Sequence, residues 1–232
     1  MKACALTDIG RVRPVNQDCR FATTEPIGPL SNLFIVADGM GGHKAGDRAS
    51  RLLIESLTSY IRNCSARTPV EALNHGIAEA NREIYEASLE HQELAGMGST
   101  LVAATIEDST LYVANVGDSR LYLIEREGIR QITRDSLEYK KQKNYITRAV
   151  GIAKTVEADF FEVGLKEGDY VLLCSDGLSN MVDNSAMFRL VLLPGPLESK
   201  ARALIALANQ NGGKDNIAVV LVDPQISEVD GL

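Results

Sequence analysis

Aspartates stand at the ends of apolar segments in this 232-residue sequence. Asp38 closes an apolar run at 33–37 and is followed by Gly39, and Asp176 closes a second run at 170–174. Asp118 follows the run at 111–116, Asp215 stands just before the run at 217–222, and Asp18 follows an N-terminal stretch that ends in Asn16-Gln17. If the apolar runs are strands of one sheet, their ends meet at one edge, and we expect these carboxylates to converge there.

Converging carboxylates repel one another unless protons or a cation neutralise them. Ligand sets made only of oxygen favour hard cations such as Mg²⁺ and Mn²⁺. An Asp-Gly pair after a strand is by itself an ordinary turn signal. Five acids in such positions along one chain are harder to explain as turns alone, so the sequence predicts a divalent-metal site.

Softer metals are poorly supported. The chain has three histidines and no HExxH motif, and its four cysteines form no CxxC pair, so a zinc site is unsupported. We expect His75 and His91, which fall in a helical block, to face solvent. His43 follows a glycine cluster and is a candidate for the surroundings of the metal site.

The glycine cluster at 39–46 lies between a predicted strand and a predicted helix, where nucleotide-binding loops also occur. Lys44 takes the place of the last glycine of a GxGxxG motif, and no GK[ST] sequence follows. We therefore interpret these glycines as a segment whose backbone approaches a metal or phosphate closely.

Two kinds of periodicity define the elements that must position these residues. Helical spacing predicts helices at 45–63, from Thr68-Pro69 onward, and at about 196–209. Buried strands are predicted at 33–37, 101–106, 111–116, 121–124, 170–174 and 217–222. The short connections between the three middle strands predict antiparallel hairpins. Strands clustered apart from helices indicate an α+β fold.

Composition narrows the function classes. A net charge of −7 and a pI near 5.1 argue against a nucleic-acid-binding surface and a polybasic membrane anchor. The apolar runs are too short to cross a bilayer, the N-terminus lacks a signal-peptide hydrophobic region, and the scattered cysteines fit reduced thiols. We expect a cytoplasmic protein with one domain at 1–225 and a loose tail at 226–232.

Seven motifs, in order, give the chain a resemblance to a known family. They are TDIGRVRPVNQD (7–18), VADGMGGH (36–43), GST (98–100), ANVGDSR (114–120), ITRAVG (146–151), CSDGL (174–178) and GKDNI (213–217). The set resembles the bacterial branch of the metal-dependent Ser/Thr protein phosphatases, type 2C (PPM). The resemblance implies a four-layer α-β-β-α sandwich of two antiparallel sheets flanked by helices.

The resemblance also implies a metal-ligand set. Asp38 would bridge two Mg²⁺ or Mn²⁺ ions, and the Gly39 carbonyl would bind the second ion. Asp176 and Asp215 would complete the ligands of the first ion, and Asp118 with Asp176 would serve a third. Two ions about 4 Å apart would acidify a bridging water, whose hydroxide would attack phosphoserine or phosphothreonine.

Further positions carry supporting roles by the same resemblance. Arg13 matches the arginine that grips the phosphoryl oxygens, for which its planar fork is suited. Asp18 matches an acid that supports the second metal through water. Thr100, Asn216 and His43 are candidates for the surroundings of the site. The implied partners are phosphorylated proteins, including a Ser/Thr kinase and its substrates, and we expect a monomer.

Three departures from the family pattern bear on the mechanism. Met40 stands where eukaryotic members have a histidine proposed as general acid, so we expect a metal-bound water to protonate the leaving oxygen. Asn180 replaces an aspartate common in bacterial relatives, which would weaken the third metal. Only eight residues, 136–143, lie between Asp135 and Asn144, where relatives have a longer flap. We expect activity on small phosphoesters with altered protein selectivity.

Two other functions remain open from sequence. A pseudophosphatase that keeps the fold as a regulatory module is disfavoured because Asp38, Asp176 and Asp215 are all present. A metal-dependent phosphodiesterase or nuclease is disfavoured by the acidic pI and the lack of a basic, aromatic-bearing groove.

Overall fold

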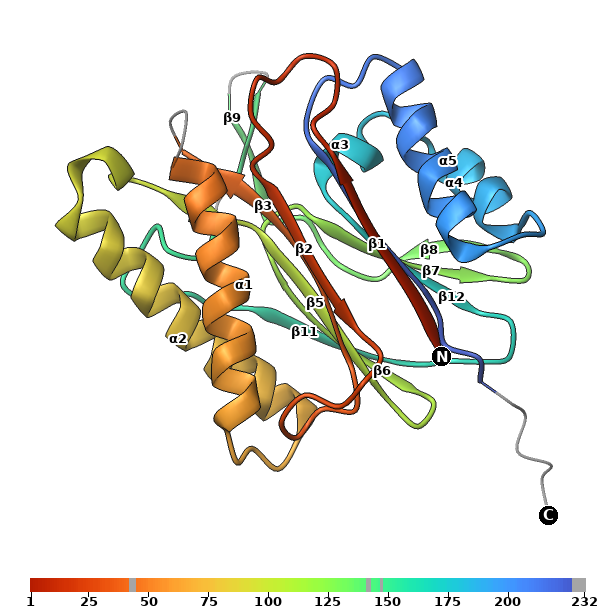
Figure 1. Cartoon of the computed structure of the whole chain (residues 1–232), viewed down its shortest axis with the longest axis horizontal. Helices are drawn as coiled ribbons and strands as arrows, with labels where there is room; N and C mark the ends of the chain where they lie inside the picture. The colour runs from red at the N-terminus through yellow and green to blue at the C-terminus, as the bar shows by residue number, and fades with distance from the viewer. Residues whose placement is uncertain (42–44, 141–142, 147, 227–232) are drawn as a thin grey trace.

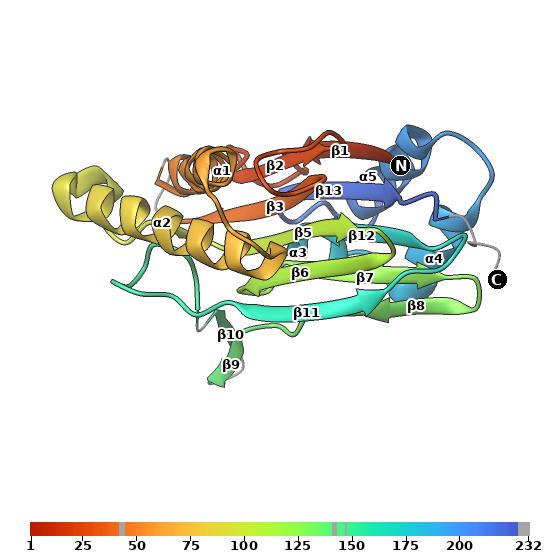
Figure 2. The same cartoon turned by 90° about the horizontal axis from the view of Figure 1, so that it is seen from below.

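Two antiparallel β-sheets packed face to face, with helices on both outer faces, make up the fold (Figures 1 and 2). The structure is a computed structural model that describes residues 1–41, 45–140, 143–146 and 148–226, with only the backbone at 137–140 and 143–146. The arrangement confirms the predicted α-β-β-α sandwich.

The first sheet has the strand order β1-β13-β12-β7-β8 and the second has the order β11-β6-β5-β3-β2. The strands of the first sheet are β1 (Lys2–Asp8), β13 (Ile217–Asp223), β12 (Tyr170–Cys174), β7 (Arg120–Glu125) and β8 (Gly128–Gln131). Those of the second are β11 (Asp159–Gly164), β6 (Thr110–Val116), β5 (Leu101–Glu107), β3 (Leu33–Met40) and β2 (Asp18–Thr23), with the short β4 (Gly98–Ser99) paired to the end of β3.

The continuous apolar sequence of β3 reflects burial on both faces. Phe34 and Val36 lie in the core between the two sheets, and Leu33, Ile35 and Ala37 lie in the core under the helices. A third core joins the first sheet to its own helices. Side chains alternate in direction along a strand, so one strand supplies two cores.

Two long helices, α1 (Ala45–Asn63) and α2 (Pro69–Glu90), cover the second sheet, and η1 (Gln92–Leu94) follows them. The bounds of α1 equal the prediction. Thr68 caps α2, because its Oγ1 accepts the Glu71 N–H at 3.2 Å. The first sheet is covered by α3 (Asp176–Ser179), α4 (Asn184–Leu192) and α5 (Leu197–Gln210).

The prediction of a hairpin between the strands at 111–116 and 121–124 was wrong. β5 and β6 do pair, but β6 belongs to one sheet and β7 to the other. Gly117, at φ +102°, turns the chain between the sheets, and the Asn115 side chain donates to the Ser119 carbonyl at 2.9 Å across that turn. The chain therefore passes from one sheet to the other at this tight turn. The neighbours of β6 are β5 and β11, and those of β7 are β12 and β8.

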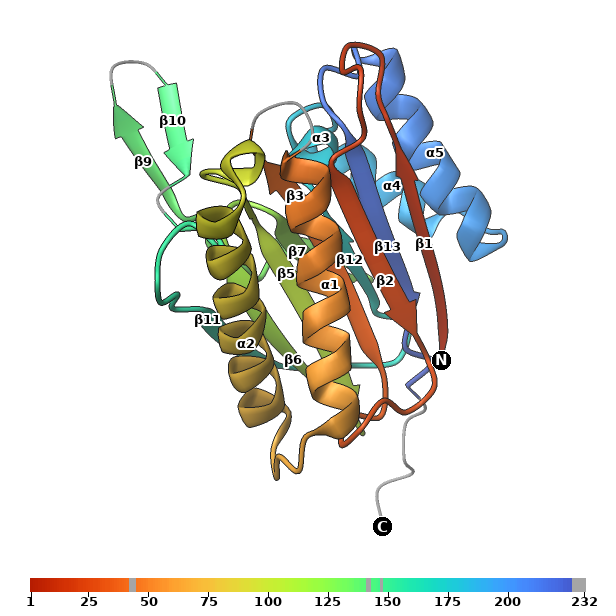
Figure 3. The ribbon, with the colours of Figure 1, turned by 60° about the vertical axis from the view of Figure 1, so that its left-hand side comes forward.

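The short segment after Asp135 forms a separate two-stranded sheet of β9 (Leu137–Lys140) and β10 (Lys143–Ile146). This hairpin and the β1–β2 loop project from the same end of the molecule (Figure 3).

None of the helices in the described ranges reaches the length and apolarity of a membrane crossing. Ile226, placed in the loose tail by the prediction, packs partly buried against the inter-sheet core, and 227–232 lie outside the described residues.

Candidate active site

The five predicted acids come from segments far apart in the sequence and meet at one end of the sandwich. Asp38 lies near the end of β3, and Asp18, at the start of β2, is its direct cross-strand partner. Asp176 begins α3, Asp118 lies in the turn between β6 and β7, and Asp215 lies just before β13. Burial and the charges of the other four carboxylates raise the pKa of Asp38 well above its usual value.

The backbone of Asp38 is held by Thr100. The Asp38 N–H donates to Thr100 Oγ1 at 3.1 Å, and the Asp38 carbonyl accepts the Thr100 N–H at 2.9 Å. The Asp38 carbonyl also accepts the Ser99 hydroxyl at 3.0 Å, and Thr100 Oγ1 lies 2.7 Å from Ser119 Oγ. Thr100 therefore fixes the position from which the Asp38 carboxylate projects.

Ser175 links Asp18 to the opposite sheet, a contact that sequence reasoning missed. Its hydroxyl donates to Asp18 Oδ2 at 2.6 Å and accepts the Ala218 N–H at 2.9 Å. Burial, with the charges of Asp176 and Asp215, raises the pKa of Asp18 to about 7, although the Ser175 bond lowers it. The signal available in sequence was a serine directly before Asp176 at a strand end.

Asp176 and Asp118 carry the remaining perturbed carboxyls. Burial, followed by the charges of Asp118 and Asp215, raises the pKa of Asp176 to about 6. The side-chain amide of Asn180 donates to Asp176 Oδ2 at 3.1 Å. Burial and the charge of Asp135 raise the pKa of Asp118. Among the described residues, the charges of Arg13 and Arg120 lower the pKa of Asp176, and that of Arg120 lowers the pKa of Asp118, without restoring the ordinary values.

Unpaired carboxylate oxygens show that a cation fits here. Within the described residues, Oδ1 of Asp18, Asp118 and Asp176 is buried and has no hydrogen-bond partner. Buried oxygens of this kind are costly unless a proton or cation satisfies them. No three His, Cys, Asp or Glu side chains of the described chain already stand in the arrangement of a metal-ligand set. The donors and their burial fit a hard cation, but the ligand set is not closed.

Asp215 is paired with Arg13 in this structure. Arg13 Nη2 donates to Asp215 Oδ2 at 2.7 Å, and Asp215 Oδ1 accepts the Asn216 N–H at 2.9 Å. The Asp215 bond raises the pKa of Arg13, and the charges of Asp176 and Asp38 add to this effect. The guanidinium therefore stands at the edge of the acid cluster, with its side chain 51% exposed.

Asn216 joins the start of β13 to the β1–β2 loop that carries Arg13. Its Oδ1 accepts the Gln17 N–H at 2.9 Å, and its Nδ2 donates to the carbonyls of Ile9 at 2.9 Å and Val15 at 3.0 Å. Asn216 is buried, so these three bonds are protected from water. Its side chain fastens both ends of the segment around Arg13.

Gly39 is required by close backbone packing. A Cβ at this position would lie 2.0 Å from the Gly46 carbonyl oxygen, so no other residue fits without moving α1. The packing brings the end of β3 against the start of α1. His43 lies outside the described residues, and its predicted place near the site stays a prediction.

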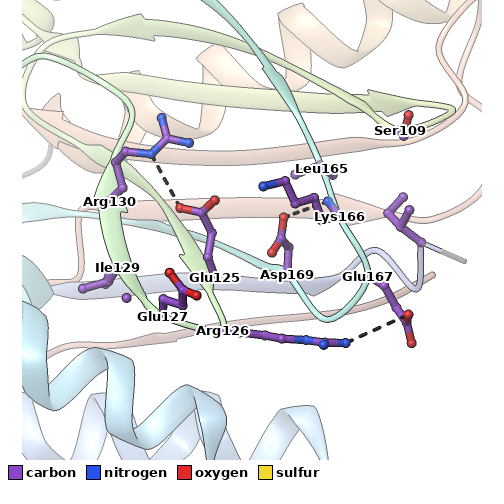
Figure 4. Close-up of a pocket in the computed structure, with 12 residues that line it drawn as sticks. Ser109, Glu125, Arg126, Glu127, Ile129, Arg130, Leu165, Lys166, Glu167 and Asp169 are labelled. Carbon is purple, nitrogen blue, oxygen red and sulfur yellow. Dashed lines mark hydrogen bonds and ion pairs between the residues drawn. The ribbon is translucent and has the colours of Figure 1, made fainter. Parts of the chain in front are cut away.

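A separate groove of about 800 Å³ lies at the far end of β7 from Asp118 (Figure 4). It is lined by the β7–β8 turn and the connection from β11 to β12, with ion pairs between Arg126 and Glu167 and between Arg130 and Glu125. Its lining contains none of the predicted site residues. We therefore assign the candidate site to the acid cluster rather than to this groove.

Comparisons with known proteins agree with this assignment. The sequence pattern of the family described as Protein phosphatase 2C matches residues 12–221. The chain is 38% identical to the serine/threonine phosphatase stp of Listeria monocytogenes, covering 96% of this chain and 95% of that protein. It is 35% identical to protein phosphatase PhpP of Streptococcus pneumoniae, over 96% and 97% of the two chains.

Solved structures give the same result. The S. agalactiae serine/threonine phosphatase matches with a TM-score of 0.87 and 34% identity, covering 95% of this chain and 98% of that one. The Mycobacterium tuberculosis serine/threonine phosphatase PstP/Ppp matches with a TM-score of 0.84 and 31% identity, over 95% and 97%. The Listeria alignment spans 246 positions against 232 residues here, so that relative has residues this chain lacks. With its acids, its sandwich and these relatives in agreement, the chain belongs to the protein phosphatase 2C family.

Proposed function

We propose that this protein removes phosphate from phosphoserine and phosphothreonine residues of other proteins at a divalent-metal centre held by its clustered aspartates. Protein-phosphatase activity follows from membership of the family. The observation that carries the metal centre is the set of buried, unpartnered oxygens on Asp18, Asp118 and Asp176 beside Asp38.

The proposed ligands follow the sequence-based assignment. Asp38 would hold two Mg²⁺ or Mn²⁺ ions, the Gly39 carbonyl would hold one of them, and Asp176 and Asp215 would hold the other. Asp118 together with Asp176 would hold a third ion, and Asp18 would support the centre through water. When bound, such ions neutralise negative charge and lower the pKa of coordinated water to near neutrality.

The other residues position the reacting groups. Arg13 binds the phosphoryl oxygens with a guanidinium that the neighbouring acids keep protonated. Thr100 and Ser175 hold Asp38 and Asp18 in place through the contacts described above. Met40 follows Gly39 and has no proton to donate, so water supplies the proton of the leaving oxygen.

The cellular setting is also a proposal. The protein acts in the cytoplasm as a monomer and opposes a Ser/Thr kinase, without nucleic-acid or membrane partners. The net charge of −7 and four free cysteines support this setting. Residues 1–225 form one catalytic domain, supported by the pairing of β1 with β13, which joins Lys2 to Asp223.

A Mn²⁺-dependent assay on a phosphothreonine peptide tests the proposed function. We expect wild type to release phosphate and Asp38→Ala and Asp215→Ala to lose at least about 100-fold in kcat. Asp47→Ala is the matched control, because Asp47 is an acid paired with Arg51 at 2.7 Å on α1. Equal rates in wild type, Asp38→Ala and Asp215→Ala would reject the metal centre, and absence of turnover in wild type would support the pseudophosphatase alternative.

A further inference from the structure

The loop that carries Arg13 exposes apolar side chains to solvent. We call residues 9–17 the Arg13 loop. Ile9 is 40% exposed, Val12 65% and Val15 36%. These are three of the eight large hydrophobic side chains that are exposed in the described chain. Single exposed hydrophobics are ordinary, but three of them in one short segment beside Arg13 make this loop a candidate contact surface.

The backbone of the Arg13 loop is firmly held. Asn216 fastens the carbonyls of Ile9 and Val15, and the Arg11 N–H donates to the Gly213 carbonyl at 2.8 Å. Gly10, at φ +79°, has its N–H bonded to Asp8 Oδ1 at 2.9 Å, and a Cβ there would lie 2.2 Å from the Asp215 carbonyl. The apolar side chains are therefore presented on a fixed backbone, which lowers the entropy lost when a partner binds.

We propose that Val12, flanked by Ile9 and Val15, binds an apolar side chain that lies one or two residues from the phosphorylated residue of the substrate. The proposal rests on the proposed function, because the phosphate is the group that fixes the substrate at Arg13. The cationic Arg13 fits the phosphate dianion, and Val12 directly precedes it in the chain, so the Cα atoms of the two residues lie about 3.8 Å apart. An extended substrate advances about 3.3 Å per residue, which is close to that spacing, so the substrate side chains assigned to Val12 are those one or two residues from the phosphorylated one.

The exposed apolar side chains of the Arg13 loop would therefore select substrates by the side chains next to the phosphorylated residue as well as by the phosphate. An apolar side chain that covers Val12 removes apolar surface of both partners from water, whereas a polar side chain there gains nothing. Each methylene-sized group buried in the contact favours binding about fourfold. We expect phosphothreonine segments with neighbouring Val, Ile or Leu to be preferred over the same segments with Asn.

Two phosphothreonine peptides that differ only in Val or Asn on each side of the phosphorylated residue test this inference. Wild type is expected to show a kcat/KM at least about fourfold higher for the Val peptide, mainly through KM. Val12→Asn should reduce this ratio to about one, and Val12→Leu should keep it. Both substitutions leave the charge beside Arg13 unaltered. Leu193→Asn is the control, because Leu193 is 54% exposed at the end of α4, and its ratio should equal that of wild type.

Hydrolysis of para-nitrophenyl phosphate with Mn²⁺, measured on the same proteins, separates this inference from the proposed function. No turnover of any substrate by wild type would contradict the proposed function itself. Turnover of both peptides at equal kcat/KM by wild type would overturn the inference alone. If Val12→Asn lowered para-nitrophenyl phosphate hydrolysis as much as Val-peptide hydrolysis, Val12 would act on loop structure rather than on the peptide, and the inference would also fall.

Discussion

The contact between Arg13 and Asp215 shows how individual residues balance charge at this site. The pair is half exposed, and ion pairs of that kind contribute little to stability. Its significance is positional, because the proposed function gives each partner a competing role. A bound phosphoryl group offers Arg13 a second set of acceptors, and a bound cation offers Asp215 a stronger counter-charge.

Replacing Arg13 tests its assignment to the phosphoryl group. We expect Arg13→Ala to lower kcat/KM for para-nitrophenyl phosphate about 10- to 100-fold, because charge-assisted hydrogen bonds contribute about 1.5–3 kcal/mol each. Arg51→Ala removes a similar 2.7 Å ion pair from the surface of α1 and should leave the kinetics unaffected. Equal losses in both variants would mean that Arg13 has no special contact with the substrate.

The raised carboxyl pKa values predict how the metal-free protein responds to pH. Asp18 and Asp176 have pKa values of about 7 and about 6 when folded, above the ordinary 3.8. The folded state then binds more protons than the unfolded state between these values, so the free energy of unfolding falls as pH rises through that range. The free energy of unfolding of most proteins decreases in acid, whereas protonation of this carboxyl cluster increases it.

Thermal unfolding in EDTA measures the effect. Going from about pH 5 to about pH 7.5, wild type should lose at least about 4 °C in Tm relative to Asp18→Asn, which cannot ionise at this position. Mn²⁺ should raise the wild-type Tm more at the higher pH, where the carboxylates are charged. Parallel Tm curves for the two proteins in EDTA would show that Asp18 does not carry an unfavourable charge.

At the scale of elements, the β1–β2 loop is held by one side chain, that of Asn216. Asn216→Ala removes three hydrogen bonds and leaves two carbonyls and one N–H of the loop without their partner. We expect a lower Tm and a KM raised about tenfold, because Arg13 loses its fixed position. Asn211→Ala breaks one exposed bond to the Met181 carbonyl and should leave KM unaltered. An unaltered KM in Asn216→Ala would contradict the positioning role.

The β9–β10 hairpin projects from the sandwich, and hydrogen bonds between residues outside the hairpin hold the two chain segments that flank it. The Ser136 N–H donates to the Gly117 carbonyl at 2.8 Å, and Arg148 Nη2 donates to Ser136 Oγ at 2.9 Å. A Gly-Ser linker in place of residues 137–146 should therefore keep hydrolysis of para-nitrophenyl phosphate within about threefold and alter the ranking of phosphopeptides. Loss of activity on both substrates, with an unaltered Tm, would show that the hairpin belongs to the catalytic machinery.

The strands that sequence could predict are those in the sheet interiors. The six predicted strands became β3, β5, β6, β7, β12 and β13, each with a neighbour on both sides. The missed strands include all four sheet edges, β1, β2, β8 and β11, whose residues are mostly half buried. Edge strands carry a weaker hydrophobic pattern because one side of the strand has no neighbour. β1 and β2 nevertheless frame the Arg13 loop.

At the scale of the whole molecule, the fold gathers acids from residue 18 to residue 215 into one region. β2 sets Asp18 opposite Asp38 within one sheet, and Ser175 ties Asp18 to the other sheet. Sequence could locate Asp38, Asp118, Asp176 and Asp215, because each stands beside an apolar segment, whereas Asp18 was assigned a role only through the family resemblance. It could not give the Ser175 bridge or the sheet switch at Gly117, because both depend on which strands meet across the sandwich.

Calorimetric titration of Mn²⁺ into the metal-free protein tests the central claim most directly, since it measures the cation site without depending on turnover. We predict that wild type binds at least two ions and that Asp38→Asn weakens the tightest binding at least about tenfold. Asp47→Asn, on the surface of α1, should bind as wild type does. Identical titrations for wild type and Asp38→Asn would contradict the account.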